Sequence, residues 1–234
     1  EVPFVVLTPF SKEVSRRLSN EDLSGVDYVF SWLGNVQLIV AIIKLLEDKM
    51  NADNDISEVG VQSIMVIEDS VRFYSSILPH LFNYLLRQSM IFSTEALNDH
   101  ERMLRMRGRP KVLLARTYEE AEELYNKYGR NMLGIVSDVR FPREGVKNGD
   151  SGIEFAKYVK SIDPNLPILF ESSEHRNRER VEAMGCKFID KHSKTLPQDL
   201  RKLVERHFGF GDFVVRNPES GEEFVIFDGG RHGY

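Results

Sequence analysis

Short apolar runs alternate along the middle of the chain with longer segments in which apolar residues recur every three or four positions. Apolar runs without polar alternation are typical of strands buried on both faces of a parallel sheet, and the longer spacing predicts amphipathic helices. Five such runs are bounded by polar residues or glycine, as strands usually are. They lie at residues 64–67, 111–115, 132–138, 167–171 and 187–191.

Helices are expected after each of these strands. Thr117 is a candidate N-cap for the second helix, and Pro79 is expected to kink or split the first. The helical segments are 71–90, 118–128, 152–162, 175–185 and 196–207. Because strands and helices alternate, the sheet must be parallel with helices on both faces. We therefore predict an α/β, flavodoxin-like, doubly wound domain with a five-stranded parallel sheet.

The two ends of the chain follow other patterns. Strands are expected at 2–7 and 26–32, each followed by a helix, at 11–23 and 36–50. Two short strands joined by a turn are expected within 213–227. We therefore divide the chain into a partial receiver-like β-α-β-α unit, a polar linker, a main domain, and a C-terminal hairpin and tail. These parts are 1–50, 51–62, 63–208 with a helical insertion at about 89–108, and 209–234.

Composition narrows the class of protein. Hydrophobic residues make up 41% and charged residues 29%, which is ordinary for a globular domain. A formal net charge of −5 argues against nucleic acid as a partner, because phosphate backbones select basic surfaces. Cys186 is the only cysteine, no signal peptide is visible, and the apolar run at 36–43 is too short to span a membrane. We expect a cytoplasmic protein without a membrane or nucleic-acid partner.

Polar side chains follow the predicted strands at the points where four of them end: Glu68 and Asp69, then Asp138, Ser172 and Lys191. In a doubly wound sheet, ligands bind at this carboxyl edge. Neighbouring carboxylates repel one another, and Mg²⁺ neutralises such a group. A lysine and a hydroxyl beside them suit in-line transfer of a phosphoryl group to a carboxylate nucleophile.

The same residues carry a family resemblance. The pieces 64-IMVIEDS-70, 135-IVSDVRFP-142, 167-PILFESSE-174 and 184-MGCKFIDKHS-193 resemble the receiver domains of bacterial response regulators. The resemblance implies that Asp138 is the phosphoacceptor, and that Ser172 and Lys191 contact the phosphoryl group. It also implies that Phe188 is a switch residue, which moves inward when Ser172 is drawn toward the phosphate.

A cofactor and partners follow from the same resemblance. It implies a Mg²⁺ ion bound by Asp69, Asp138 and the backbone carbonyl of Arg140, with Glu68 reaching the ion directly or through water. The phosphodonor is then a histidine kinase or a small phosphorylated compound, and an attached output domain is switched. We expect a signalling module and not an enzyme. The sequence does not name the donor, the output domain or the oligomeric state, and it leaves a homodimer open.

A narrower resemblance supports an alternative function. The pieces 93–121, 136–145, 193–201 and 208–213 look like the receiver-like regulatory region of bacterial phosphoenolpyruvate synthase or pyruvate, phosphate dikinase-like proteins. The alternative is a receiver-like scaffold that no longer switches, attached to catalytic domains outside this chain. A small flavodoxin-like enzyme is a weaker alternative, because no glycine-rich phosphate loop follows the first strand of the main domain.

Some positions depart from the family pattern. His192 stands where receivers usually carry a proline, and the segment 143–151 is longer than usual. In the front unit, Thr8 and Tyr28 match the hydroxyl and aromatic positions, but Ser31 replaces the lysine. We therefore expect the main domain to be a specialised receiver and the front unit to be a degenerate partial copy.

Each candidate also has a plain structural explanation. Alone, Asp138 is an ordinary turn residue, Lys191 a solvated lysine, and Ser172 a helix N-cap. The histidines lack metal-ligand spacing, and the basic segment 102–109 is typical of a solvated helix end. All five residue types in order, each at a strand end, favour the phosphoacceptor interpretation.

Overall fold

The fold is described from a computed structural model. It covers residues 2–9, 25–94, 108–208, 212–216 and 223–228. The helix predicted at 11–23, and most of the predicted insertion, lie outside the described residues. No helix in the described ranges combines the length and the apolar character needed to cross a membrane.

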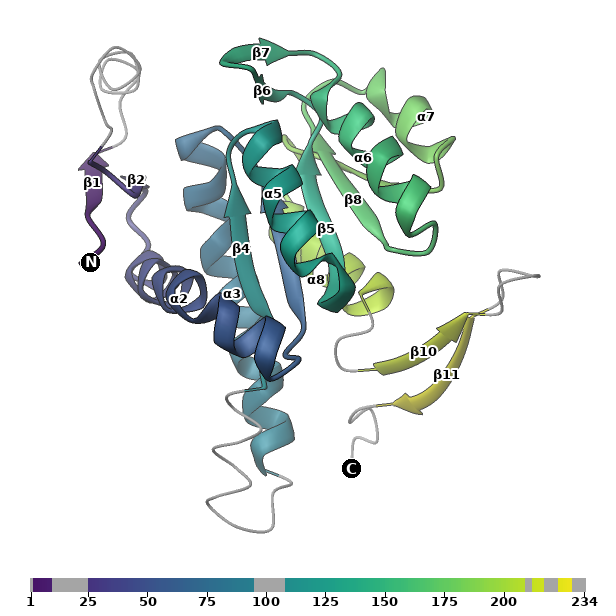
Figure 1. The fold of residues 1–234 in the computed structure, drawn as a ribbon, viewed down its shortest axis with the longest axis horizontal. Helices are drawn as coiled ribbons and strands as arrows, with labels where there is room; N and C mark the ends of the chain where they lie inside the picture. The colour runs from purple at the N-terminus through teal and green to yellow at the C-terminus, as the bar shows by residue number, and fades with distance from the viewer. Residues whose placement is uncertain (1, 10–24, 95–107, 209–211, 217–222, 229–234) are drawn as a thin grey trace.

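A five-stranded parallel sheet forms the centre of the molecule (Figure 1). Its strand order is β4-β3-β5-β8-β9, so the first strand of the domain lies between the second and the third. This order is the flavodoxin-like one, and the predicted fold class is confirmed. The strands are β3 (Ser63–Ile67), β4 (Lys111–Ala115), β5 (Met132–Asp138), β8 (Ile168–Ser172) and β9 (Lys187–Asp190).

Helices cover both faces of this sheet, each face with its own apolar core. One core packs α3 and α8 against the sheet, and the other packs α5, α6 and α7 (Figure 1). Thr117 caps α5 as predicted, since its hydroxyl oxygen accepts a hydrogen bond from the Glu120 amide. The helices are α3 (Val71–Thr94), α5 (Tyr118–Tyr128), α6 (Ser151–Ile162), α7 (Asn177–Glu182) and α8 (Leu196–His207), with a short 3-10 turn η2 (Gly129–Asn131) before β5.

Two details of the main domain differ from expectation. Pro79 lies within one continuous α3, so the helix is not split there. Residues 89–94, which we assigned to the insertion, form the last turns of α3. Ser89 illustrates why: its hydroxyl bonds to the Leu85 carbonyl, as helical residues four apart do, and it is buried.

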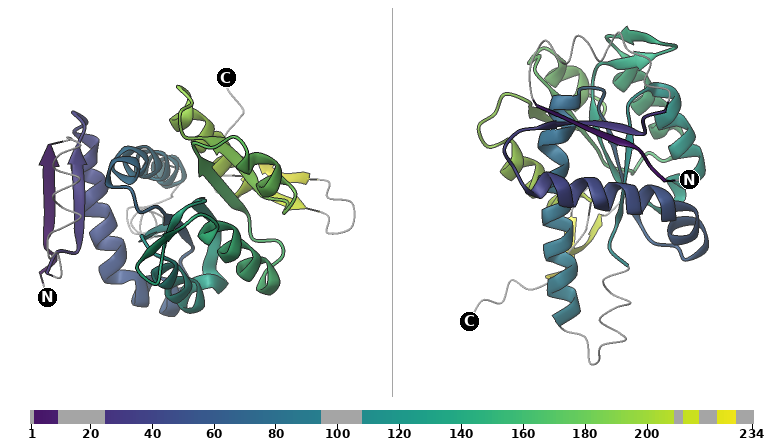
Figure 2. Two further views of the ribbon diagram at one scale, coloured as in Figure 1. Left: turned by 90° about the horizontal axis from the view of Figure 1, so that it is seen from above. Right: turned by 90° about the vertical axis from the view of Figure 1, so that its left-hand side faces the viewer.

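The front unit packs against the edge of the main domain. Its strands β1 (Val5–Pro9) and β2 (Tyr28–Trp32) form a parallel pair. The helix α2 (Gln37–Ala52) follows, and the Asn35 side chain accepts a hydrogen bond from the Gln37 amide at its start. One face of α2 lies against α3 and β4 (Figure 2).

The expected linker is helical over most of its length. Helix α2 continues to Ala52, and a π-helical turn, η1 (Asp53–Glu58), follows directly. Ile56 is fully buried in a small cluster with Leu113 and Tyr128. Residues 51–58 of the predicted linker are therefore helical and partly buried. The sequence of this segment resembles a linker because the solvent-exposed face of a surface helix is polar.

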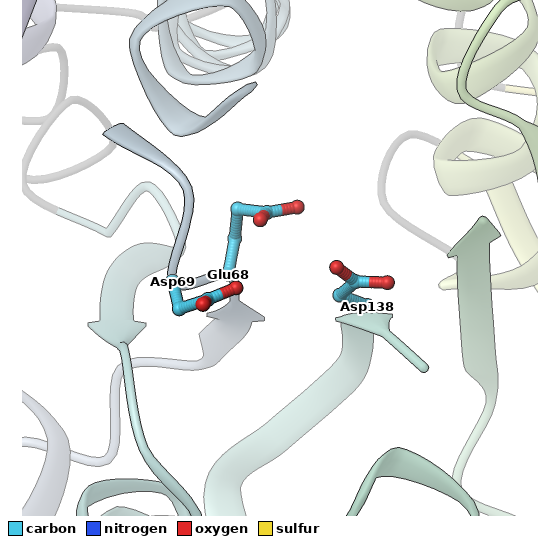
Figure 3. A group of neighbouring side chains, drawn as sticks. All are labelled: Glu68, Asp69 and Asp138. Atoms are coloured by element: carbon cyan, nitrogen blue, oxygen red, sulfur yellow. The ribbon is translucent and has the colours of Figure 1, made fainter. Parts of the chain in front are cut away.

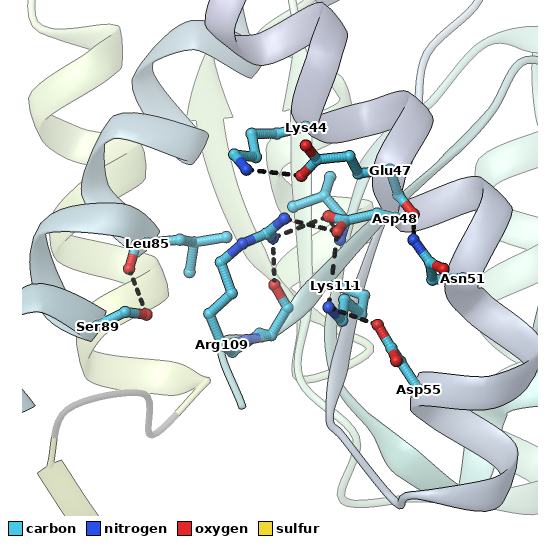
Figure 4. A network of polar contacts seen from close by, with 11 residues as sticks. Lys44, Glu47, Asp48, Asn51, Asp55, Leu85, Ser89, Arg109 and Lys111 are labelled. Atoms are coloured by element: carbon cyan, nitrogen blue, oxygen red, sulfur yellow. Dashed lines mark hydrogen bonds and ion pairs between the residues drawn. The ribbon is translucent and has the colours of Figure 1, made fainter. Parts of the chain in front are cut away.

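A buried ionic network fastens α2 to β4 (Figure 4). Both oxygens of the fully buried Asp48 accept hydrogen bonds from Arg109, at 2.6 and 2.9 Å, and one also accepts from the Val112 amide. Lys111 lies 2.7 Å from Asp55 and 4.0 Å from Asp48. The expectation of a solvated basic segment is thus wrong for Arg109, because a buried acid on α2 draws its guanidinium inward.

Two hairpins complete the fold. The predicted C-terminal hairpin is present as antiparallel β10 (Asp212–Arg216) and β11 (Glu223–Asp228). A second hairpin, β6 (Phe141–Arg143) and β7 (Val146–Asn148), was not predicted. Its turn places Glu144 and Gly145 at positive φ, the conformation that tight hairpin turns require. In Figure 1 this hairpin stands at the top, above the carboxyl ends of the strands.

Candidate functional site

Three carboxylates meet at the carboxyl edge of the sheet. Glu68 and Asp69 directly follow β3, and Asp138 ends the neighbouring strand β5. One oxygen from each lies within 4.8 Å of the other two (Figure 3). The structure therefore brings together the acids that sequence reasoning singled out, because β3 and β5 are adjacent and end at the same height.

Lys191 extends toward these acids from the end of β9, an edge strand of the sheet. It follows β9, and its amine lies 2.8 Å from Asp138 Oδ2 and forms a second, shorter ion pair with Glu68. The ring of Phe73 on α3 lies beneath the amine, 4.4 Å away at its centroid. The Lys191 side chain is 4% exposed, so the solvated-lysine explanation does not hold.

Burial and neighbouring charges shift the pKa values of this cluster in opposite directions. Burial raises the pKa of Glu68, and the Lys191 ammonium opposes that rise. Burial alone would lower the pKa of Lys191, but the carboxylates of Glu68, Asp138 and Glu171 together raise it above its ordinary value. Lys191 is thus a firmly charged amine held directly against the predicted phosphoacceptor.

Ser172 lies at the same edge, but its hydroxyl is used locally. Its Oγ accepts hydrogen bonds from the Glu174 amide and from the Asn177 side-chain amide, both at 3.1 Å. Its carbonyl oxygen accepts from the Lys191 amide. In the described contacts the Ser172 hydroxyl bonds only to the segment at the start of α7, so its role at a phosphoryl group stays a prediction.

Two further predicted positions have other contacts in the structure. The Arg140 side chain forms an ion pair with Glu174 at 2.8 Å, and metal binding by its backbone carbonyl stays a prediction. Phe188 is already buried in the core under α7, with the Arg178 guanidinium 4.6 Å from its ring centroid. Its inward movement as a switch residue is likewise not tested.

Gly152 sets the backbone of the acceptor loop. Its amide donates to the Val139 carbonyl at 3.0 Å, which brings the start of α6 onto the end of β5. A Cβ atom at this position would lie 2.4 Å from the carbonyl oxygen of Asp138. Only glycine permits this approach, so α6 helps to fix where Asp138 stands.

Glu171 is a neighbour of the site that sequence reasoning missed. It precedes Ser172 in β8, opposite Asp138 in the strand register, and it is 1% exposed. Neither carboxyl oxygen has a hydrogen-bond partner. Burial raises its pKa to about 8, and Lys191 opposes the rise. An acid within an otherwise apolar strand was the signal that should have marked it.

Lys147 is a second missed residue. It stands on β7, and its amine forms an ion pair with Asp69 Oδ2 at 2.8 Å. Nothing in the sequence marked it, because lysine is common in surface loops. Only the folded hairpin brings it over the acidic cluster.

The three carboxylates fit a divalent cation of the Mg²⁺ type. They offer hard oxygen ligands, which such ions prefer. Asp69 Oδ1 is buried and has no hydrogen-bond partner, so this oxygen is available to a cation. The donor set suits Mg²⁺ better than a transition metal, because no cysteine or histidine belongs to it.

Comparisons with known proteins give structural neighbours only. No family model matches the chain, and neither does any curated protein. A response regulator receiver domain protein from Clostridium thermocellum is 15% identical, with a TM-score of 0.39 over 63% of this chain and 94% of that one. A LuxR-family two-component response regulator from Aurantimonas sp. is 18% identical, with a TM-score of 0.41 over 64% and 86%.

A third neighbour is the N-terminal domain of an uncharacterized protein from Wolinella succinogenes. It is 20% identical, with a TM-score of 0.37 over 62% of this chain and 91% of that one. None of the three supports the narrower resemblance to phosphoenolpyruvate synthase-like proteins. Identities and TM-scores this low assign no function; the strand order of the sheet establishes the receiver-like, flavodoxin-like fold.

Proposed function

We propose that this chain is a receiver module of a phosphorelay, which accepts a phosphoryl group on Asp138 with the help of a bound Mg²⁺ ion. The observation that carries the proposal is the buried amine of Lys191, which pairs with both Asp138 and Glu68. Burying a charged lysine costs free energy of folding. A lysine buried beside a strand-end acid is therefore expected where its charge has a function.

The chemistry follows from what each side chain offers. A carboxylate oxygen of Asp138 attacks phosphorus in line, its bond to phosphorus forms, and the bond from phosphorus to the donor breaks. Lys191 places a positive charge where the phosphoryl oxygens would lie. Glu68, Asp69 and Asp138 would hold Mg²⁺, which supplies charge neutralisation for the phosphoryl oxygens when bound.

The partners of this function are part of the proposal. The donor is a histidine kinase or a small phosphorylated compound, and the receiver passes its change to an attached output domain in the cytoplasm. Ser172 would release Asn177 and turn toward the phosphoryl group, since its hydroxyl now serves only local bonds. Phe188, in the core under α7, would respond to that movement.

A mass measurement tests the proposal. The whole chain is incubated with acetyl phosphate and Mg²⁺, and we expect a mass gain of one phosphoryl group. Asp138→Asn should abolish the gain, because an amide is not a nucleophile of this kind. Asp53→Asn is the matched control, since Asp53 is an exposed acid on η1 at the opposite end of the sheet. No mass gain in the unaltered chain under saturating donor contradicts the proposal.

One observation favours the second candidate, a receiver-like scaffold that does not switch and could regulate a phosphoenolpyruvate synthase-like phosphotransferase. Lys147 pairs with Asp69, and a cation-binding carboxylate already held by an amine suits a site that no longer binds metal. This candidate predicts self-association, or binding to a catalytic partner, that Asp138→Asn does not alter. Sedimentation of the two forms, with and without donor, separates the candidates.

A further inference from the structure

Lys147 lies where a cation would approach the acidic cluster. Its amine is 2.8 Å from Asp69 Oδ2, and Asp69 belongs to the carboxylate group that fits Mg²⁺. We propose that Lys147 is a tethered competitor of the divalent cation, and that metal binding displaces it and loosens the β6–β7 hairpin. This inference rests on the proposed function, because it concerns the metal of that site.

The hairpin that carries Lys147 is anchored at its base. Phe141 is fully buried, and its carbonyl accepts a hydrogen bond from the Ser151 hydroxyl at 2.8 Å. Arg143 pairs with Glu154 on α6, and its guanidinium lies 4.2 Å from the ring centroid of Tyr118 on α5. These contacts on two helices fix the direction of β6.

The tip of the hairpin is held as well. The Glu144 amide donates to Glu119 on α5 at 2.8 Å, and the ladder pairs Lys147 with Pro142. The connection between β5 and β6 is short, since β6 begins only three residues after Asp138, and it limits how far the hairpin can move from the acceptor strand. The fold therefore holds the hairpin backbone, and with it the base of the Lys147 side chain, over the acidic cluster.

Charge explains why the competition is reversible. Four acids gather at this edge, Glu68, Asp69, Asp138 and Glu171, against the amines of Lys191 and Lys147. Even without a charge on Glu171, the three metal-binding carboxylates carry more charge when ionised than two ammonium groups neutralise, so a divalent cation is still attracted. The Lys147 side chain is 52% exposed, so its pair with Asp69 is weak and can be broken. A cation on Asp69 would repel the ammonium at this distance.

The function of such a competitor is to set the cation affinity and to report occupancy. With Lys147 on Asp69, the site fills only when the cation concentration is high enough to displace the amine. When the amine leaves, the hairpin loses the ion pair between Lys147 and Asp69. The surface that β6 and β7 present then changes when the metal binds. Metal occupancy thereby becomes visible to a partner that touches β6 and β7.

Cation affinity measured on the whole chain tests the inference. Calorimetric titration with Mg²⁺ should show about three- to fivefold tighter binding for Lys147→Met than for the unaltered chain, because the competing amine is gone. Lys157→Met is the matched control, since it removes an exposed lysine on α6 and should leave the affinity unchanged. Equal affinity in all three forms would overturn the inference and leave the proposed function standing.

A second readout follows the hairpin itself. Hydrogen exchange of residues 146–148 should speed up when Mg²⁺ is added to the unaltered chain. In Lys147→Met the exchange should already be fast and should not respond to the cation. Exchange that is indifferent to Mg²⁺ in the unaltered chain, with the cation bound, overturns the coupling. Failure of Mg²⁺ to bind any of the forms overturns the proposed metal-dependent function, and this inference with it.

Discussion

Two clusters of buried charge stand at opposite ends of the same sheet. At the amino end, the acids Asp48 and Asp55 meet the bases Arg109 and Lys111, and the charges balance (Figure 4). At the carboxyl end, acids outnumber bases. Glu68, Asp69 and Asp138 (Figure 3) pair with Lys191 and Lys147, and Glu171 is buried beside them without a hydrogen-bond partner.

Hydrogen bonding separates the two clusters further. Asp48 has donors for both oxygens, from the Arg109 guanidinium and the Val112 amide. Among the described residues, the buried side-chain atoms without a hydrogen-bond partner belong to Asp69 and Glu171, both at the carboxyl end. A cluster that satisfies itself holds the fold together, whereas one that leaves buried oxygens free is prepared for a ligand. This contrast supports a structural role for the amino-end cluster and agrees with the ligand-binding role proposed for the carboxyl-end cluster.

The largest effect on stability is expected from a substitution that breaks the amino-end cluster. Asp48→Ala leaves the Arg109 guanidinium buried without its partner, which should lower the free energy of unfolding by about 3–5 kcal/mol. Urea denaturation followed by circular dichroism measures the loss. Glu47→Ala on the same helix is the control, because Glu47 forms an exposed pair with Lys44 and should change stability by about 0.5 kcal/mol or less.

The two variants together test the contrast. A loss below about 1 kcal/mol for Asp48→Ala would mean that the cluster is not structural. Asp48→Ala should also leave phosphoryl acceptance on Asp138 intact wherever the chain stays folded, since the clusters lie at opposite ends of β4 and its neighbours.

A moderate effect is expected from the unsatisfied acid of the other cluster. In the folded chain the pKa of Glu171 is raised from 4.5 to about 8 by burial. The folded state therefore retains a proton that the unfolded state releases above pH 4.5, and stability falls as pH rises from 4.5 through 8. Glu171→Gln removes this titration and should be more stable than the unaltered chain by about 2 kcal/mol near pH 6, with the difference growing as the pH rises toward 8.

Thermal unfolding across this pH range measures the effect. The gain should shrink toward zero near pH 4.5, where both forms are neutral at this position. Glu182→Gln on α7 is the control, because Glu182 is an exposed acid paired with Arg178. A gain at high pH that persists undiminished at low pH would show that the amide improves packing, and that charge at Glu171 is not the cause.

The smallest effect concerns the hairpin above the carboxyl-end cluster. Glu144 and Gly145 occupy the two positive-φ positions of its turn, and asparagine adopts that conformation more readily than glutamate. Glu144→Asn should raise stability by about 0.5 kcal/mol and slow hydrogen exchange in β7. Faster exchange in β7 would contradict the assigned turn conformation.

Much of the fold was predictable, because it depends on local pattern. Apolar runs located the five strands of the main sheet, and the alternation with helices required a parallel arrangement. The gathering of Glu68, Asp69, Asp138 and Lys191 followed from their places at strand ends. The prediction of a solvated helix end failed at Arg109, where a buried partner overrides local character. The helical form of residues 51–58 was not visible in their polar sequence, because it depends on the burial of Ile56.

The sequence by itself determined the fold class and the edge of the sheet at which the acids and Lys191 gather, because the periodicity of side chains fixes which strands are buried and where they end. Only the tertiary structure decided that Lys147 lies on Asp69, that Glu171 is buried without a partner, and that Asp48 holds Arg109. Such contacts join residues far apart in the chain, and their charges acquire meaning only through burial, which no local pattern encodes.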